Sequence, residues 1–242
     1  MGLGRAVSAP RGQGVTVTIP LRDTIPSRSF PIVSVFLIVV NVAVFIYEFA
    51  LGRGVNGFIT RNGLIPVGIT GAGDAAGVPF RPYTLLTSLF LHGGWLHVGG
   101  NMLYLWIFGD NVEDRLGHVR FLIFYLLCGV AASLTHVLAN PVSTVPTIGA
   151  SGAIAGVLGA YFLLYPRSRV LTVLPLGFYL QVVQVPAYLF LGFWFLLQFV
   201  VGAASLSAGA GREGVAWWAH VGGFAAGAGL QYVFRKRGGE WA

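Results

Sequence analysis

A serine flanked by glycines at the start of an apolar run is the residue best suited to nucleophilic chemistry in this sequence. Ser151 lies in the stretch 147–156, directly after a Pro-rich loop. Gly149 and Gly152 allow backbone or a substrate to approach its hydroxyl closely, and the first turn of a helix offers unpaired N–H groups at the positive end of the dipole. These features suit a nucleophile beside an anion-stabilising pocket. The alternative is a small-residue packing face made by Gly152 and Gly156.

A histidine in the last apolar run is the best candidate for a general base. Gly223 and Gly227 follow His220 at i+3 and i+7, so all three share one helical face. Glycines on that face allow a close approach to a partner helix, which a hydrogen bond of about 2.6–3.2 Å from Ser151 to His220 requires. The alternative is a structural histidine bonded to a backbone carbonyl.

Two further polar residues are candidates for stabilising an oxyanion. His97 and Asn101 are spaced i, i+4 and therefore lie on one face of a helix. Both side chains can donate hydrogen bonds to a developing negative charge, although interhelical hydrogen bonding that only serves packing is the alternative. Loop, supporting or structural roles are expected for the remaining histidines: His92, His118 and His136.

The sequence offers no carboxylate partner for these histidines. It contains no H-E-x-x-H motif, and no acidic residue shares their helices at their depth, so we expect neither a zinc site nor an organic cofactor. The acidic residues predicted near the same side of the membrane are Glu48, Asp74 and Glu213, and only Glu48 borders an apolar run. A Ser-His dyad is therefore expected in place of a Ser-His-Asp triad.

Composition assigns the chain to the membrane. Of its 242 residues, 55% are hydrophobic and 10% charged, whereas a soluble domain carries about 25% charged residues. The formal charge of +7 comes from basic residues that border apolar runs, which indicates a membrane surface and no nucleic acid. A single cysteine, Cys128, excludes an internal disulfide.

Apolar periodicity and length predict an all-α bundle of six transmembrane helices. Residues 1–30 are expected to form a flexible tail, 31–234 the membrane domain and 235–242 a basic tail. Residues 52–82 are predicted to be a long loop with apolar patches lying against lipid, and 166–186 are too broken for a span. The six predicted helices are 31–50, 95–109, 119–139, 150–165, 187–206 and 215–234.

The distribution of basic residues predicts the orientation of this bundle. All Lys and Arg residues except Arg53, Arg61, Arg81 and Arg212 fall on the side that holds both termini, which is therefore expected to be cytoplasmic. The candidate site residues all lie near the N-terminal ends of helices that begin on the opposite side. We therefore expect them at one depth, in the outer part of the bilayer.

With these motifs in this order, the chain resembles the rhomboid intramembrane serine proteases over about residues 31–234. The stretches 149–152 and 219–223 are similar to the family's G-x-S-G and A-H-x-x-G motifs, and 97–101 is similar to its H-x-x-x-N motif. Residues 109–117 are similar to its G-x-x-x-E-x-x-x-G element. Many members carry Trp-Arg in the first loop, where this chain has Tyr83-Thr84.

The resemblance implies specific roles for the matching residues. Ser151 would be the nucleophile and His220 the general base, while His97, Asn101 and the Ser151 amide would hold the oxyanion. Structural roles in helix packing would fall to Gly149, Gly152, Gly156, Gly223, Gly227, Glu113 and Arg115.

The same resemblance implies an activity and a location. The chain would be a serine endopeptidase that cuts transmembrane segments of other proteins near their outer end, as a multi-pass protein of the plasma or bacterial inner membrane. Its partners would be transmembrane protein substrates and the lipid bilayer. A non-catalytic relative that binds transmembrane helices, and a small channel or transporter, are the alternatives.

Overall fold

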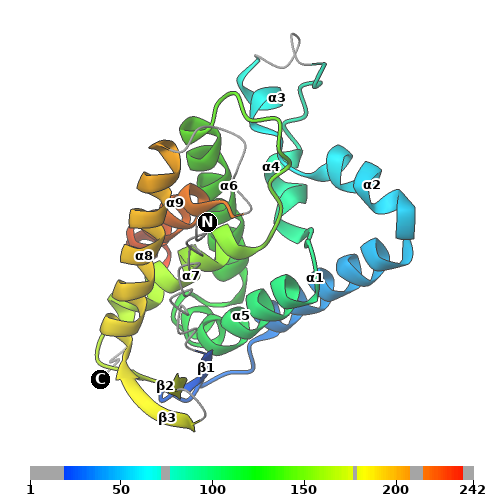
Figure 1. Ribbon diagram of the computed structural model, residues 1–242. Coiled ribbons are helices and arrows are strands. Elements are labelled where there is room, and N and C mark those ends of the chain that lie inside the picture. Colours follow the sequence, from blue (N-terminus) through cyan, green and yellow to red (C-terminus); the bar gives the residue numbers. More distant parts are fainter. Residues whose placement is uncertain (1–18, 72–76, 177–178, 208–214, 237–242) are drawn as a thin grey trace, which may run out of the picture.

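The computed structural model describes residues 19–71, 77–176, 179–207 and 215–236, which are mostly helical with a small sheet at one end (Figure 1). Six longer helices lie where the sequence predicts them, but α5 continues to Leu116, beyond the predicted end near residue 109. The longer helices are α1 (Ile32–Ala50), α5 (Trp95–Leu116), α6 (His118–Ala139), α7 (Ser151–Leu164), α8 (Ala187–Ser207) and α9 (Trp217–Phe234). Shorter elements are η1 (Gly52–Gly54), α2 (Val55–Asn62), α3 (Pro66–Thr70), α4 (Thr84–Thr87) and η3 (Ser88–Phe90).

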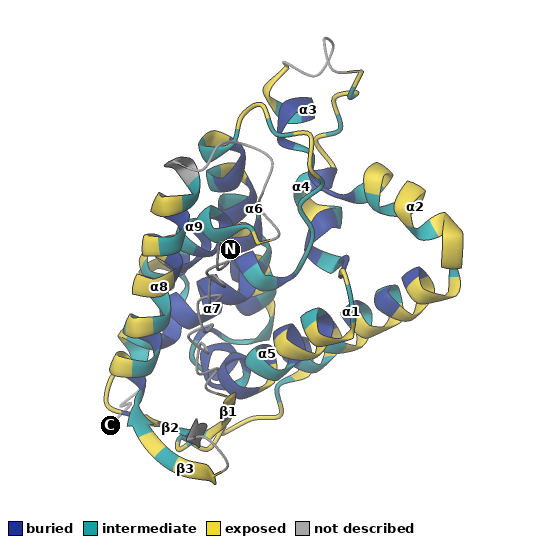
Figure 2. Cartoon of the chain, in the orientation of Figure 1, coloured by how far each residue is buried: buried dark blue, intermediate teal, exposed yellow. Residues whose placement is uncertain are grey.

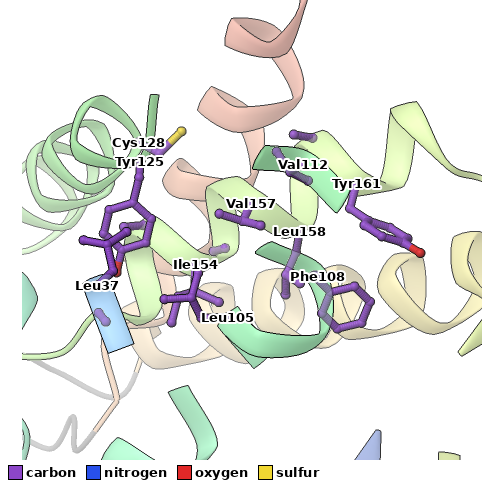
Figure 3. Packing of buried hydrophobic residues seen from close by; sticks show 14 of the residues in the cluster. Leu37, Leu105, Phe108, Val112, Tyr125, Cys128, Ile154, Val157, Leu158 and Tyr161 are labelled. Atoms are coloured by element: carbon purple, nitrogen blue, oxygen red, sulfur yellow. The ribbon is translucent and has the colours of Figure 1, made fainter. Parts of the chain in front are cut away.

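Helix α7 is the centre of the bundle. It packs against α5, α6, α8 and α9, most extensively against α9, and every residue from Gly152 to Tyr161 is buried (Figure 2). Figure 3 shows Ile154, Val157 and Leu158 of α7 packed with Leu105 and Phe108 of α5. A helix that is apolar on every side is stable only when it is surrounded. The short apolar run that Ser151 opens therefore forms the core of the protein.

Glycines set the distance between α7 and α9. A methyl group built on Gly227 would lie 1.9 Å from the carbonyl oxygen of Gly156, and one built on Gly223 would lie 2.0 Å from that of Gly152. Any side chain at these positions would force the two backbones apart. Because Ser151 begins α7 and His220 lies in the first half of α9, this contact controls the separation of the two candidate catalytic residues.

Within the described residues, three helices are long and apolar enough to cross a membrane: α1, α6 and residues 187–205 of α8. Helix α7 is a shorter apolar helix. Figure 2 shows exposed faces along α1 and α8. The exposed residues there are large and apolar, among them Phe36 and Ile46 of α1 and Leu196 and Val200 of α8. Apolar surface of this extent is typical of a lipid-facing helix.

A three-stranded antiparallel sheet corrects the prediction of a purely helical protein. Strands β1 (Ile19–Asp23), β2 (Arg169–Leu176) and β3 (Tyr179–Pro186) lie in the order β1-β2-β3. Strand β1 falls within the segment predicted to be a flexible tail, and β2 and β3 form the segment judged too broken for a span. The β-branched residues of this segment favour strands. The prolines and the other apolar residues of the segment obscured this preference in the sequence. Residues 1–18 and 237–242 lie outside the described residues.

The sheet is tied to the helical core through Asp23. Its Oδ2 accepts hydrogen bonds from the Tyr161 hydroxyl of α7 at 2.5 Å and from Asn111 Nδ2 of α5 at 2.8 Å. Burial disfavours the ionised carboxylate and raises the pKa of Asp23 to about 6. The folded protein therefore binds a proton at Asp23 more tightly than the unfolded chain does.

This shift predicts a pH dependence of stability that Asp23→Asn removes. The stabilising contribution of protonated Asp23 is full below its unfolded pKa of 3.8 and is lost as pH rises through its folded pKa of about 6. The difference in melting temperature between wild type and Asp23→Asn should therefore fall between pH 4.5 and 7. Tryptophan fluorescence melts of both proteins in detergent would measure it. A difference that stays constant or grows with pH would contradict the assignment.

The charged end of α5 anchors the start of α1, which explains why α5 is longer than predicted. The buried carboxylate of Glu113 accepts hydrogen bonds from Val33 N at 2.9 Å, Ser34 N at 2.7 Å and Ser34 Oγ at 2.8 Å. It therefore pairs with unsatisfied N–H groups at the positive end of α1. The Arg115 carbonyl accepts a hydrogen bond from Lys236 N at 3.2 Å, which joins the ends of α5 and α9.

The apolar patch at Leu64 and Val67, between α1 and α5, packs on protein, contrary to the prediction that it lies against lipid. Leu64 is 1% and Val67 3% exposed, and Leu64 exchanges backbone hydrogen bonds with Thr147, just before Ser151. At the Tyr83-Thr84 position, the Tyr83 hydroxyl donates to the Arg61 carbonyl at 3.1 Å. This segment therefore braces the loop that leads into α7.

Candidate active site

Ser151 and His220, 69 residues apart in the sequence, are in hydrogen-bond contact. The distance from Ser151 Oγ to His220 Nε2 is 2.8 Å. Ser151 is the first residue of α7 and His220 lies one turn into α9. The glycine contact between these helices allows this distance, as argued from the spacing of Gly223 and Gly227. A serine in contact with an imidazole nitrogen is the arrangement of an activated nucleophile and its base.

A glutamine that the sequence reasoning missed occupies the other nitrogen of the imidazole. Gln198 Oε1 of α8 lies 2.7 Å from His220 Nδ1. The ring of Trp194, one turn earlier on α8, lies 5.8 Å from the His220 ring. Gln198 carries the only amide side chain in the apolar run 187–206. A polar side chain inside a predicted span was the signal that could have found it.

His97 lies with its donor-capable nitrogen directed at the loop before Ser151. The backbone N–H of Gly93 donates to His97 Nδ1 at 3.3 Å. A neutral imidazole that accepts at one nitrogen carries its proton on the other, so Nε2 is the donor. A methyl group built on Gly149 would lie 2.8 Å from His97 Nε2 and 3.6 Å from Ser151 Oγ. The donor therefore lies close to the nucleophile.

Gly149 is required at its position for two independent reasons. Its φ of +129° is a conformation that residues with a side chain rarely adopt, and its Cβ would collide with the His97 ring. Its N–H donates to the Ser88 carbonyl at 2.9 Å, which fixes the loop. The space left by the missing side chain separates His97 from Ser151.

Asn101 supplies a second donor without a partner. Its Nδ2 atom is buried and makes no hydrogen bond within the described residues. An unpaired buried donor costs about 1–3 kcal/mol, so a native protein retains one chiefly where a ligand or water completes it. Asn101 lines the same cavity as His97, Ser151 and His220.

These residues line one cavity of about 780 Å³ between α5, α7, α8 and α9. Aromatic and aliphatic side chains such as Trp95, Leu158 and Trp194 form much of its wall. A largely apolar cavity with a few convergent polar groups is typical of a binding site for an organic substrate.

The described acidic residues do not contact the imidazole of His220. Glu48 is buried, but its Oε2 accepts from the backbone N–H of His92 at 3.1 Å. Asp74 and Glu213 lie outside the described residues. Across the described part of the chain, no cluster of three or more His, Cys, Asp or Glu side chains that could hold a metal ion is present.

The remaining histidines support the site or lie away from it. The rings of His92 and His97 contact each other at 5.1 Å, and His136 Nε2 lies 3.0 Å from Thr147 Oγ1 in the loop before Ser151. His118 pairs with Glu113 at 2.5 Å. Thus His92 and His136 brace the site, whereas His118, the first residue of α6, lies beside Glu113 at the far end of α5.

The apolar helices and the part-buried serine-histidine pair indicate a membrane protein with a hydrolase-like site. Comparison with known proteins gives its family. Residues 79–237, about two thirds of the chain, match the Rhomboid domain. The chain therefore belongs to the rhomboid family.

The similar proteins include one that is named a rhomboid protease and others that are named rhomboid or rhomboid-like proteins. The chain is 44% identical over 78 residues to Rhomboid protease GluP of Bacillus subtilis, covering 32% of this chain and 15% of that protein. It is 37% identical over 92 residues to Rhomboid protein 1, mitochondrial, of Saccharomyces cerevisiae, covering 36% and 27%. It is 33% identical over 155 residues to RHOMBOID-like protein 1 of Arabidopsis thaliana, covering 64% and 35%. In these three comparisons the aligned part covers between 15% and 35% of the relative's own length.

Proposed function

We propose that this protein is an intramembrane serine endopeptidase that works with a Ser-His dyad. The observation that carries the proposal is the 2.8 Å contact between Ser151 Oγ and His220 Nε2 inside a cavity that also holds the unpartnered Asn101 amide. The name of the Bacillus relative, a rhomboid protease, supports the same activity. Glu113 and Arg115 have structural roles in this proposal, as do the glycines of α7 and α9.

In the proposed mechanism, Ser151 attacks the scissile carbonyl while His220 Nε2 takes the hydroxyl proton. The negative charge of the tetrahedral intermediate is held by His97 Nε2–H, by Asn101 Nδ2–H and by the Ser151 N–H at the positive end of α7. His220 then protonates the leaving amine, and water attacks the acyl-enzyme with His220 again as base. Apart from the substrate and one water molecule, the proposed steps use only groups of the protein.

The proposed topology has six transmembrane spans and both termini in the cytoplasm. In it, residues 1–30 and 235–242 flank a membrane domain of residues 31–234, which lies in the plasma or bacterial inner membrane. Short α7, enclosed by longer helices, then begins below the outer surface, so Ser151 meets a transmembrane substrate near the outer end of its span. The substrate preference in this proposal is for small residues at the cut and helix-breaking residues beyond it.

Two measurements on the purified protein test this function. A fluorophosphonate probe should label wild-type protein at Ser151, because the probe reacts with activated serines. Incubation with a panel of transmembrane substrates in liposomes, followed by mapping of the cut ends, should give cleavage within the membrane region. Substrate binding with neither labelling nor cleavage would favour a non-catalytic helix-binding protein instead.

Removing either oxyanion donor should slow cleavage without abolishing it. Asn101→Ala and His97→Ala are each expected to lower kcat by about 10²–10³-fold, the usual effect of one such donor. Fluorophosphonate labelling and kcat should both be measured, with Asn56→Ala on the exposed surface of α2 as a control amide. Full activity in both variants would show that the two residues serve helix packing only.

A further inference from the structure

Gln198 is a buried polar residue on a helix that otherwise faces outward. Most of α8 is exposed, and the helix turns a narrow face inward that includes Leu191 and Gln198. Gln198 is 6% exposed. Burial of an amide is unfavourable unless it is hydrogen-bonded, and its partner is the imidazole of His220 at 2.7 Å. The inward face of α8 therefore brings the Gln198 amide into hydrogen-bond contact with His220, the proposed general base.

The chemistry of this contact fixes the position of a proton. With Gln198 Oε1 as the acceptor in this contact, His220 Nδ1 is the donor and carries the proton. In neutral imidazole the lone pair then lies on Nε2, which faces Ser151 Oγ at 2.8 Å. With the opposite tautomer, Nε2 would carry the proton and could not accept one from Ser151.

We propose that Gln198 is the positioning residue of the active site, which holds His220 in the tautomer and orientation that a general base needs. The proposal rests on the function proposed above. It adds a neutral positioning residue from α8 to the Ser151-His220 dyad. An aspartate in that place would stabilise the imidazolium as well as orient it, whereas an amide orients without adding charge to the core.

The aromatic contacts of His220 do not determine which ring nitrogen carries the proton. Trp194 and Trp217 contact its ring at 5.8 and 6.3 Å between centroids, with interplanar angles of 37° and 87°. Such contacts restrain the plane of the imidazole. They do not distinguish Nδ1 from Nε2, since neither requires a proton at a given nitrogen. Hydrogen bonds to the ring nitrogens come from Gln198 and Ser151, and the proposal assigns the choice of tautomer to Gln198.

Three variants separate positioning from packing. Gln198→Leu removes the acceptor at similar size, and we expect kcat for a cleaved transmembrane substrate to fall about 10- to 100-fold, the effect of an unpaired buried donor. Gln198→Glu keeps an acceptor at the same place and should be clearly faster than Gln198→Leu. Gln181→Leu makes the same change on exposed strand β3 and should match wild type. Equal rates for wild type and Gln198→Leu would overturn the proposal.

Nitrogen NMR of ¹⁵N-labelled histidine reports the tautomer directly. The His220 signals are assigned by their loss in His220→Ala. In unaltered protein the proton should be on Nδ1, and Gln198→Leu should shift the population toward Nε2–H. A proton on Nε2 in the unaltered protein would overturn the proposal without any variant. If the protein neither cleaves nor labels, the proposed function fails, while the NMR result still decides whether Gln198 fixes the tautomer.

Discussion

Replacing Ser151 with alanine is expected to lower cleavage by at least about 10⁴-fold while the protein stays folded. Removing the nucleophile leaves only the contribution of the oxyanion donors and substrate binding. The change deletes a single oxygen atom and one hydrogen bond, that to His220, worth about 1 kcal/mol of stability. Cleavage of a transmembrane substrate and a thermal melt in the same detergent would measure both effects.

The control for this variant is Ser205→Ala. The Ser205 hydroxyl donates to the Gly202 carbonyl within α8, on a turn away from the cavity. This variant should cleave at the wild-type rate and keep its fluorophosphonate labelling, whereas Ser151→Ala should lose both. Comparable turnover by Ser151→Ala and wild type would exclude Ser151 as the nucleophile.

Gly227→Ala is expected to damage stability and activity together. The added methyl group would lie 1.9 Å from the Gly156 carbonyl oxygen, so α9 must move away from α7. Overpacking of a tight core costs about 1–3 kcal/mol, and we expect the upper end or more because the obstacle is backbone. His220 moves with α9, and a displacement of about 1 Å from its attacking geometry costs about 10²-fold in rate.

The same helix supplies a matched control. A methyl group built on Gly229, two residues further on, would have no atom within 4 Å. Gly229→Ala should therefore raise stability by about 0.5–1 kcal/mol through helix propensity alone and leave cleavage unchanged. Melts and rates for both variants should be compared in one detergent. If Gly227→Ala behaves like Gly229→Ala, α7 and α9 are not held together by their glycine faces.

The sequence by itself determined the positions of the long helices and the motifs that carry Ser151 and His220. Apolar runs of membrane-spanning length predicted the positions of α1, α6 and α8, and the structure confirms them. The serine between glycines and the i+3, i+7 glycines after His220 carried enough local information to place both residues at a helix-helix contact. The same motifs indicated the rhomboid family, which the match over residues 79–237 confirms.

The sheet and the burial of the apolar patch at Leu64 depend on contacts between segments that are far apart in the sequence. A local sequence pattern does not predict such contacts. Strand β1 pairs with β2 across about 150 residues, and its strand character depends on that partner. The patch at Leu64 is covered by the loop before α7, so its apolar side chains meet protein and not lipid. Composition alone cannot tell these two environments apart, because both exclude water.

Gln198 is the clearest case of information that only the tertiary structure holds. In the sequence it is one amide in an apolar run, and its helical face alone does not say whether it meets lipid, a neighbouring helix or a cavity. The packing of α8 beside α9 brings its oxygen to His220 Nδ1 at 2.7 Å. A hydrogen bond requires a donor-acceptor distance that varies by only a few tenths of an ångström. The relative placement of two helices specifies such a distance, and side chains along the whole length of both helices set that placement.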